Sequence, residues 1–197
     1  MQEAGSNLKL TLAAAAALVA LACGGGRDAQ TLVIAPEAPT VVVGETLPIT
    51  VTPMADLAGD VDWEVQETYG GGLLQSQGLH VTYVPPEAAG TYHLLLRAPG
   101  RNGHVYKDLV AVKVLPGATV DPVAPRLQPG SSIQFRVRMK GLARDTATWV
   151  VEEAEGGEIG PEGRYTAPRK PGLYHITATS TVDPSAVARA TVTVGAD

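Results

Sequence analysis

A chain of 197 residues has room for one or two domains, and its 22 glycines, 15 prolines and 5% aromatic residues predict short strands joined by turns rather than a helical bundle. The net charge of −5 is made of interspersed residues of both signs, which argues against a nucleic-acid-binding surface, because such a surface needs clustered Lys and Arg. It also gives no electrostatic reason for binding to an anionic membrane surface.

The N-terminal segment has the pattern of an export signal. Lys9 is followed by an uncharged run of thirteen residues, Leu10 to Ala22, which is shorter than the ~20 residues that a transmembrane helix needs. Small residues end the run, and the only cysteine, Cys23, follows where a signal peptide would be cleaved. We therefore interpret residues 1-22 as a signal peptide.

The residues around this cleavage position, Ala20-Leu21-Ala22-Cys23, resemble a bacterial lipobox. The resemblance implies that the Cys23 thiol is acylated and anchors the mature chain to a membrane. The alternative is an ordinary secretory leader with an incidental cysteine. Residues 23-30 would form the lipidated cysteine and a glycine-rich tether. The exported domains would have no disulfide and would depend on their hydrophobic cores for stability.

The rest of the chain contains two copies of one pattern. Five landmarks recur with matched spacing, namely Gly44, Trp63, Tyr83, Tyr92 and Val112 in the first copy and Gly130, Trp149, Tyr165, Tyr174 and Val194 in the second. Trp63 and Tyr83 are four residues further apart than Trp149 and Tyr165, and we place the extra residues around Tyr69 to Gly72. The preserved spacing indicates an internal duplication.

Apolar and polar residues alternate within each copy, which is typical of strands with one buried face. Ile133, Phe135 and Val137 alternate with polar residues in this way, and turn sequences such as Asp183-Pro184-Ser185 separate the runs. No sustained helical periodicity follows residue 22. About seven short strands in each copy predict a β-sandwich.

The predicted fold is therefore all-β, with two tandem β-sandwiches after the signal peptide. The proline-containing segment Leu115–Pro125 is interpreted as their boundary and predicts a short, fairly stiff connection. The first predicted domain covers residues 31-115, and the second covers residues 116-197.

The second copy carries the elements W-x-V, GG, G-x-YTAP, PG-x-Y-x-I-TATS, DPS and A-x-VTV between Trp149 and Val194. This run resembles bacterial immunoglobulin-like domains, which occur in tandem on surface proteins and adhesins. The first copy resembles them more loosely, with Tyr83-Val84-Pro85-Pro86 in place of YTAP. The resemblance implies an immunoglobulin-like β-sandwich for each copy and brings no catalytic residues with it.

Four aromatic residues have predicted structural roles. Trp63 and Trp149 follow turns in the alternating pattern, and we interpret them as the buried tryptophan of each sandwich rather than as sugar-stacking surfaces. Tyr92 and Tyr174 each follow a glycine turn, at a position like that of a tyrosine corner.

The candidate binding loop is where the copies diverge. It consists of Tyr69, Gly70, Gly71, Gly72, Leu73 and Leu74. Loops that differ on a shared scaffold often carry recognition. The alternative is a longer hairpin with no binding role.

No sequence motif indicates an enzyme, a cofactor or a metal centre. His93 and His175 occupy equivalent, outward-facing strand positions, one in each copy, which is poor geometry for a zinc site. No GxSxG motif or phosphate-binding loop is present. Calcium at the domain junction is left open, because residues such as Asp121 fit ordinary turn roles equally well.

These features favour a non-catalytic cell-envelope lipoprotein, anchored through Cys23 to the outer membrane and either periplasmic or surface-exposed. Its domains would serve as a spacer or docking module for envelope or surface proteins, including further copies of itself. One alternative is an adhesin-type or carbohydrate-binding module, for which Tyr69, Tyr106 and Tyr165 are the available aromatic residues. Another is a subunit of an extracellular fibre that assembles by strand addition. No nucleic-acid partner is expected.

Overall fold

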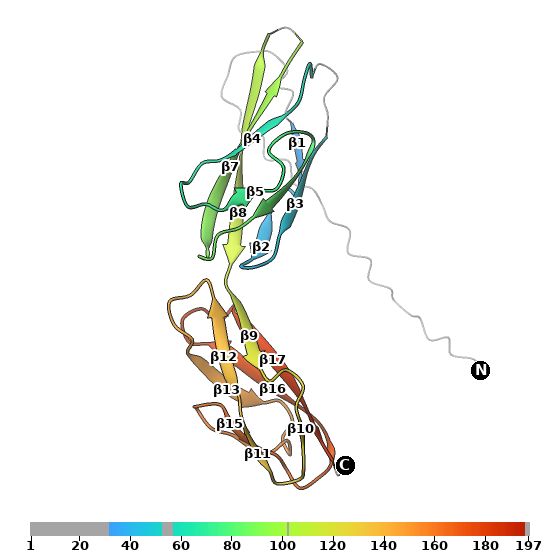
Figure 1. Cartoon of the computed structure of the whole chain (residues 1–197), viewed down its shortest axis with the longest axis vertical. Helices are drawn as coiled ribbons and strands as arrows, with labels where there is room; N and C mark the ends of the chain where they lie inside the picture. The colour runs from blue at the N-terminus through green and yellow to red at the C-terminus, as the bar shows by residue number, and fades with distance from the viewer. Residues whose placement is uncertain (1–31, 53–56, 102, 196–197) are drawn as a thin grey trace, which may run out of the picture. The chain divides into compact units, whose positions relative to one another are not determined.

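The computed structural model describes residues 32–52, 57–101 and 103–195. Over these residues the chain forms seventeen β-strands and no helix, which confirms the all-β prediction (Figure 1). Consequently no helix long and apolar enough to cross a membrane occurs within them. The predicted signal peptide, Cys23 and the tether lie outside the described residues.

The first sandwich is made of two four-stranded sheets, with the strand orders β1–β3–β6–β5 and β2–β8–β7–β4. The bounds are β1 Val33–Ala35, β3 Leu47–Thr52, β6 His80–Val84 and β5 Gly72–Leu73 in one sheet, and β2 Thr40–Val42, β8 Val105–Leu115, β7 Gly90–Pro99 and β4 Asp62–Val65 in the other. Neighbouring strands are antiparallel except β2 and β8, which are parallel.

The second sandwich follows a similar plan. One sheet has the order β10–β17–β16–β13, and two smaller ladders, β11–β15–β14 and β12–β9, face it across the core. The bounds are β10 Arg126–Leu127, β17 Val187–Val194, β16 Gly172–Ser180 and β13 Ala147–Val151, then β11 Ser132–Gln134, β15 Arg164–Thr166, β14 Glu158–Ile159, β12 Arg136–Lys140 and β9 Gly117–Asp121. Only Phe135 separates β11 from β12.

Alternation of side chains along each strand builds two separate hydrophobic cores. In β3, Leu47, Ile49 and Val51 are buried while their neighbours are more exposed, because successive side chains of a strand point to opposite faces. The first core extends from Leu32 to Val114 and the second from Val120 to Val194, with no shared residue. Each copy of the duplicated pattern therefore forms its own β-sandwich.

The proline-containing segment between the copies is more ordered than the sequence suggested. Strand β8 ends at Leu115 and β9 begins at Gly117, so Pro116 alone lies between them. Strand β9 pairs with β12 and belongs to the second sandwich. Backbone pairing therefore continues through most of the segment Leu115–Pro125, which the sequence predicted as the connection, and the break between strands falls at the predicted boundary of residues 115 and 116.

The aromatic residues with predicted structural roles differ in burial between the copies. Trp63 is 4% exposed, whereas Trp149 packs against its core but is only partly buried. The hydroxyls of Tyr92 and Tyr174 donate hydrogen bonds to the carbonyls four residues upstream, Ala88 at 3.1 Å and Lys170 at 2.9 Å. This is the geometry of a tyrosine corner.

Candidate functional site

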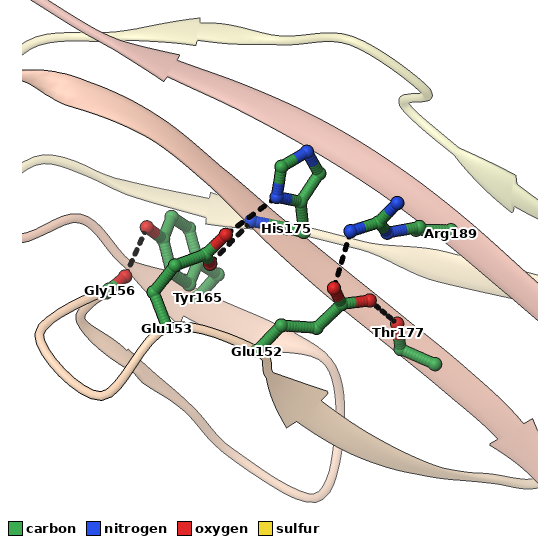
Figure 2. A network of polar contacts seen from close by, with 7 residues as sticks. All are labelled: Glu152, Glu153, Gly156, Tyr165, His175, Thr177 and Arg189. Atoms are coloured by element: carbon green, nitrogen blue, oxygen red, sulfur yellow. Dashed lines mark hydrogen bonds and ion pairs between the residues drawn. The ribbon is translucent and has the colours of Figure 1, made fainter. Parts of the chain in front are cut away.

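A glutamate–histidine pair recurs in both sandwiches. In each, the glutamate follows the strand that contains the tryptophan and bonds to a histidine of the neighbouring strand. The backbone N–H of His93 donates to Glu67 Oε2 at 2.9 Å, and His93 Nδ1 lies 2.6 Å from Glu67 Oε1. In the second sandwich, the His175 N–H donates to Glu153 at 2.8 Å, and the ring contact is again 2.6 Å (Figure 2). Both oxygens of each carboxylate are therefore engaged within the fold.

These contacts explain the acid–base behaviour of the two glutamates. The backbone N–H of His93 holds the pKa of Glu67 below its usual value, and the backbone N–H of His175 does the same for Glu153. The signal for this pair is present in the sequence as a glutamate four residues after each tryptophan, but alternation alone showed only that the histidines face outward.

Beside Glu153, a second polar contact joins the residue after β13, Glu152, to strands β16 and β17. The Thr177 hydroxyl donates to Glu152 Oε1 at 2.5 Å, and the Arg189 guanidinium donates to Glu152 Oε2 (Figure 2). The hydrogen bond from Thr177, and then that from Arg189, lowers the pKa of Glu152. Because the Glu152 carboxylate is exposed, this cluster adds little stability.

Buried tyrosines hold an equivalent turn in each sandwich. Tyr83 donates to the Gly70 carbonyl at 2.5 Å, and Tyr165 donates to the Gly156 carbonyl at 2.6 Å. Burial raises the pKa of both tyrosines to about 12. Tyr165 is 0% exposed, so the prediction that it could serve as an aromatic surface for a carbohydrate is wrong.

The glycine after each of these carbonyls has a backbone conformation that a side chain would not tolerate. Gly71 and Gly157 both have φ of 92°, and an added Cβ would lie 2.2 Å from the carbonyl oxygen of Val84 or Thr166. Gly70-Gly71 and Gly156-Gly157 are therefore the same turn. Placing the extra residues of the first copy around Tyr69 to Gly72 was wrong, and the structure shows them after Leu73 instead.

The predicted binding loop thus has parts with different surroundings. Tyr69 is 88% exposed and Leu74 is 70% exposed, whereas Gly70 is buried and Gly72-Leu73 forms β5. Only the two exposed side chains are available to a partner, and the binding role of this loop stays a prediction.

The extra residues of the first copy close the gap between β3 and β4. The Trp63 N–H donates to Ser76 O, and the Gly78 N–H donates to Val61 O, both at 2.8 Å. The Trp63 indole Nε1–H donates to Gly78 O at 3.1 Å. On the other side of the segment, the Val51 N–H of β3 donates a hydrogen bond of 2.8 Å to Leu79 O.

The corresponding edge of the second sandwich is open. Its hairpin turns back at Gly160–Gly163, where the Phe135 N–H donates to Gly163 O at 2.8 Å. Neither the backbone N–H nor the indole N–H of Trp149 has a hydrogen-bond partner among the residues that the structure describes. The outer side of β13 therefore exposes unpaired backbone groups.

A groove of about 500 Å³ lies along this edge. Its lining includes Phe135, Arg136, Val137, Asp145, Trp149 and Glu162, and we call it the Trp149 groove. It offers an aromatic ring, backbone donors and acceptors, and charges of both signs. Neither here nor elsewhere in the described ranges do three His, Cys, Asp or Glu side chains gather as metal ligands would.

Comparisons with known proteins leave the family of the chain open. No protein-family model matches it, and no curated protein sequence matches it. Similar solved structures include the C-terminal 282-residue fragment of intimin in complex with the intimin-binding domain of its translocated receptor, Tir, at 14% identity and a TM-score of 0.47. The match covers 84% of this chain and 64% of that fragment.

Two other solved structures are similar with lower TM-scores. The insect immune protein hemolin has 13% identity and a TM-score of 0.43, with 85% of this chain and 46% of hemolin covered. Fibronectin(III)-like modules of CbhA from Clostridium thermocellum have 14% identity and a TM-score of 0.35, with coverage of 83% and 93%. This chain spans less than two thirds of the intimin fragment and less than half of the hemolin chain. The fold therefore rests on the strand pairing described above.

Proposed function

We propose that this chain is a non-catalytic lipoprotein of the cell envelope, whose two immunoglobulin-like sandwiches form a spacer and docking module for an envelope or surface assembly. The observation that carries the proposal is the open edge beside Trp149, at a place that the first sandwich closes with its own residues. Unpaired edge groups are a template for pairing with another chain.

The absence of reactive geometry around the paired side chains supports a binding role. The polar side chains that recur in both copies, Glu67 with His93 and Glu153 with His175, are bonded to each other across neighbouring segments. Each pair connects neighbouring segments within its own sandwich. The duplicated fold then supplies two sandwiches and an open strand edge, which a docking module can use.

Attachment through Cys23 is the second part of the proposal. Each buried CH₂ contributes about 0.8 kcal/mol, so two or three acyl chains hold a protein firmly at a membrane where one chain does not. The short tether would keep the first sandwich near that membrane. Replacing Cys23 with Ser should abolish labelling by a radioactive fatty acid and move the protein to the soluble fraction. Unchanged membrane association of Cys23→Ser would contradict the lipid anchor.

The docking role is tested by cross-linking the lipidated protein in its own cells, purifying it in mild detergent, and identifying its companions by mass spectrometry. The expected result is a partner in a fixed ratio. A monomer without companions, found under conditions that cross-link a known envelope complex, would contradict docking.

An adhesin-type or carbohydrate-binding role retains one specific observation, the 88% exposure of Tyr69. An exposed tyrosine ring can stack on a sugar face. Binding to a glycan array that is lost on Tyr69→Ala, with unchanged folding, would favour this second function.

A further inference from the structure

The two sandwiches differ at one edge in a way that indicates what the second one binds. We propose that the Trp149 groove binds an extended peptide segment of a partner protein, which runs antiparallel to β13 and places a glycine beside Trp149. This inference rests on the proposed docking function and assigns a site to it. The first sandwich shows the expected arrangement, because its own segment Ser76–Leu79 occupies the equivalent position.

The hydrogen bonds of that segment define what the second sandwich lacks. In the first sandwich, the segment accepts from the Trp63 N–H and donates to Val61 O, and residues Asp62 and Gln77 form an antiparallel bridge. The counterparts of Val61 and Trp63 in the duplicated pattern are Ala147 and Trp149. A bound peptide would thus accept from the Trp149 N–H and donate to Ala147 O.

The Trp149 side chain supplies a further donor. In the first sandwich the indole N–H of Trp63 is satisfied by Gly78 O at 3.1 Å. The indole N–H of Trp149 has no such partner within the described ranges, although the ring is partly buried against the core. A carbonyl of a bound peptide would satisfy this donor, and an indole N–H usually has a partner when it is buried.

The opposite wall of the groove offers a third donor, which is a backbone N–H. The N–H groups of Phe135 and Met139 both point away from β9, toward Gly163 O and Asp145 Oδ1 respectively. Since every second N–H of a strand points the same way, the N–H of Val137 faces the groove. Its counterpart in the first sandwich is Val51, whose N–H donates to Leu79 O at 2.8 Å.

The sequence of β13 lacks the features that protect an edge strand from pairing. Ala147–Val151 reads ATWVV, with no charge, proline or glycine. Natural edge strands are often blunted by lysine, proline or a bulge. Strand β4 of the first sandwich instead carries Asp62 and Glu64 and is covered by its own hairpin.

The chemistry of the partner segment follows from the first sandwich and from the charges of the groove. Gly78 has φ of 104°, a conformation that favours glycine, and it lies between an uncharged polar residue and a leucine. The Trp149 groove carries Arg136 on one wall and the carboxylates of Asp145 and Glu162 on the others, so it presents no field of a single sign. The groove therefore suits an uncharged, glycine-containing segment.

A second copy of this chain is a poorer occupant. The Ser76–Leu79 segment of any copy is already bonded within its own first sandwich. Two β13 edges could pair symmetrically, but β13 contains no glycine to fit beside Trp149. A partner protein with a free segment is therefore the occupant that we infer, and self-association is an outcome of the test.

The test uses the full-length chain in detergent and a synthetic peptide with the sequence of residues 74 to 81, LQSQGLHV, at concentrations up to the millimolar range. Binding is followed by NMR at the backbone and indole N–H signals of Trp149, with the Trp63 signals as an internal control. We expect saturable shifts at Trp149 and none at Trp63. The same peptide with valine in place of its glycine should bind at least about tenfold more weakly, which corresponds to about one buried hydrogen bond.

A graft variant provides the matched control. Replacing Gly160–Arg164 with the longer Leu74–Thr82 sequence should close the groove from within the chain, pair the Trp149 indole, and abolish peptide binding. Peptide binding that survives the graft, or the absence of binding to the folded native chain, would overturn the proposal. Concentration-dependent dimerisation that the graft removes would instead identify a second copy as the occupant.

The outcomes of this test and of the docking experiment are distinguishable. A stoichiometric envelope partner without peptide binding would leave the docking function standing at another surface. If the peptide binds at the Trp149 groove but no partner is found in cells, the site stands and the docking role does not.

Discussion

The buried hydroxyl of Tyr165 allows the second sandwich to be tested at two pH values. Tyr165 is 0% exposed and donates to the Gly156 carbonyl at 2.6 Å. Replacing Tyr165 with Phe removes the hydrogen bond and leaves the carbonyl buried without a donor. We expect the free energy of unfolding of the second sandwich to fall by about 1–3 kcal/mol at neutral pH.

The same residue predicts a loss of stability in alkali. Burial raises the pKa of Tyr165 from 10.0 to about 12, so the folded state keeps a proton that the unfolded state loses between these values. The stability from this group is complete below pH 10 and decreases as the pH rises toward 12. A shift of this size corresponds to a loss of about 3 kcal/mol. The Tyr165→Phe variant should lose this part of the alkaline decline.

Urea unfolding followed through the indole signal of Trp149 reports the second sandwich alone. The first sandwich, whose buried Tyr83 is unchanged in the variant, is the matched control. Its unfolding, followed through the indole signal of Trp63, should occur at the same urea concentration in the native chain and in Tyr165→Phe. A cost of less than about 0.5 kcal/mol for Tyr165→Phe at neutral pH, which is below the usual range for a hydrogen bond, would contradict a stabilising bond from Tyr165 to Gly156. A free energy of unfolding that declines as steeply above pH 10 in the variant as in the native chain would contradict the raised pKa of Tyr165.

Two further predictions concern residues near the same turn. The pKa of Glu153 is held below 4.5, first by the backbone N–H of His175, so the stability it confers is present above pH 4.5 and is lost as the pH falls through the lower folded value. Glu153→Gln should flatten the acid dependence of unfolding, and an unchanged slope would contradict the pairing. Gly157→Ala should destabilise the second sandwich by more than about 1 kcal/mol in thermal unfolding, because its Cβ would meet Thr166 O at 2.2 Å. Gly195→Ala, which meets nothing within 4 Å, is the control, and equal effects of the two would count against the turn assignment.

The alternation of apolar residues was enough to predict the two sandwiches, because a strand with one buried face must repeat every second residue. Ile49 and Phe135, which the duplication aligns, are each 1% exposed. Spacing also predicted the positions of Tyr92 and Tyr174, since the tyrosine-corner hydrogen bond joins residues only four apart. Local patterns were therefore informative about local contacts.

The open edge depends on contacts between segments distant in sequence, which explains why it was not predicted. Gly70-Gly71-Gly72 looked like an insertion because the second copy has only two glycines there. The actual difference lies between Leu73 and Tyr83, where extra residues bond to both β3 and β4. Whether a hairpin reaches a neighbouring strand is set by backbone hydrogen bonds that no residue type signals.

The open edge beside Trp149 is tested most directly by hydrogen exchange of two equivalent backbone amides in the free, full-length chain. The Trp63 N–H donates to Ser76 O, so we predict that it exchanges slowly. The Trp149 N–H faces the groove without a described partner and should exchange orders of magnitude faster. Equal protection of the two amides would show that the edge of the second sandwich is already covered and would contradict an open edge beside Trp149.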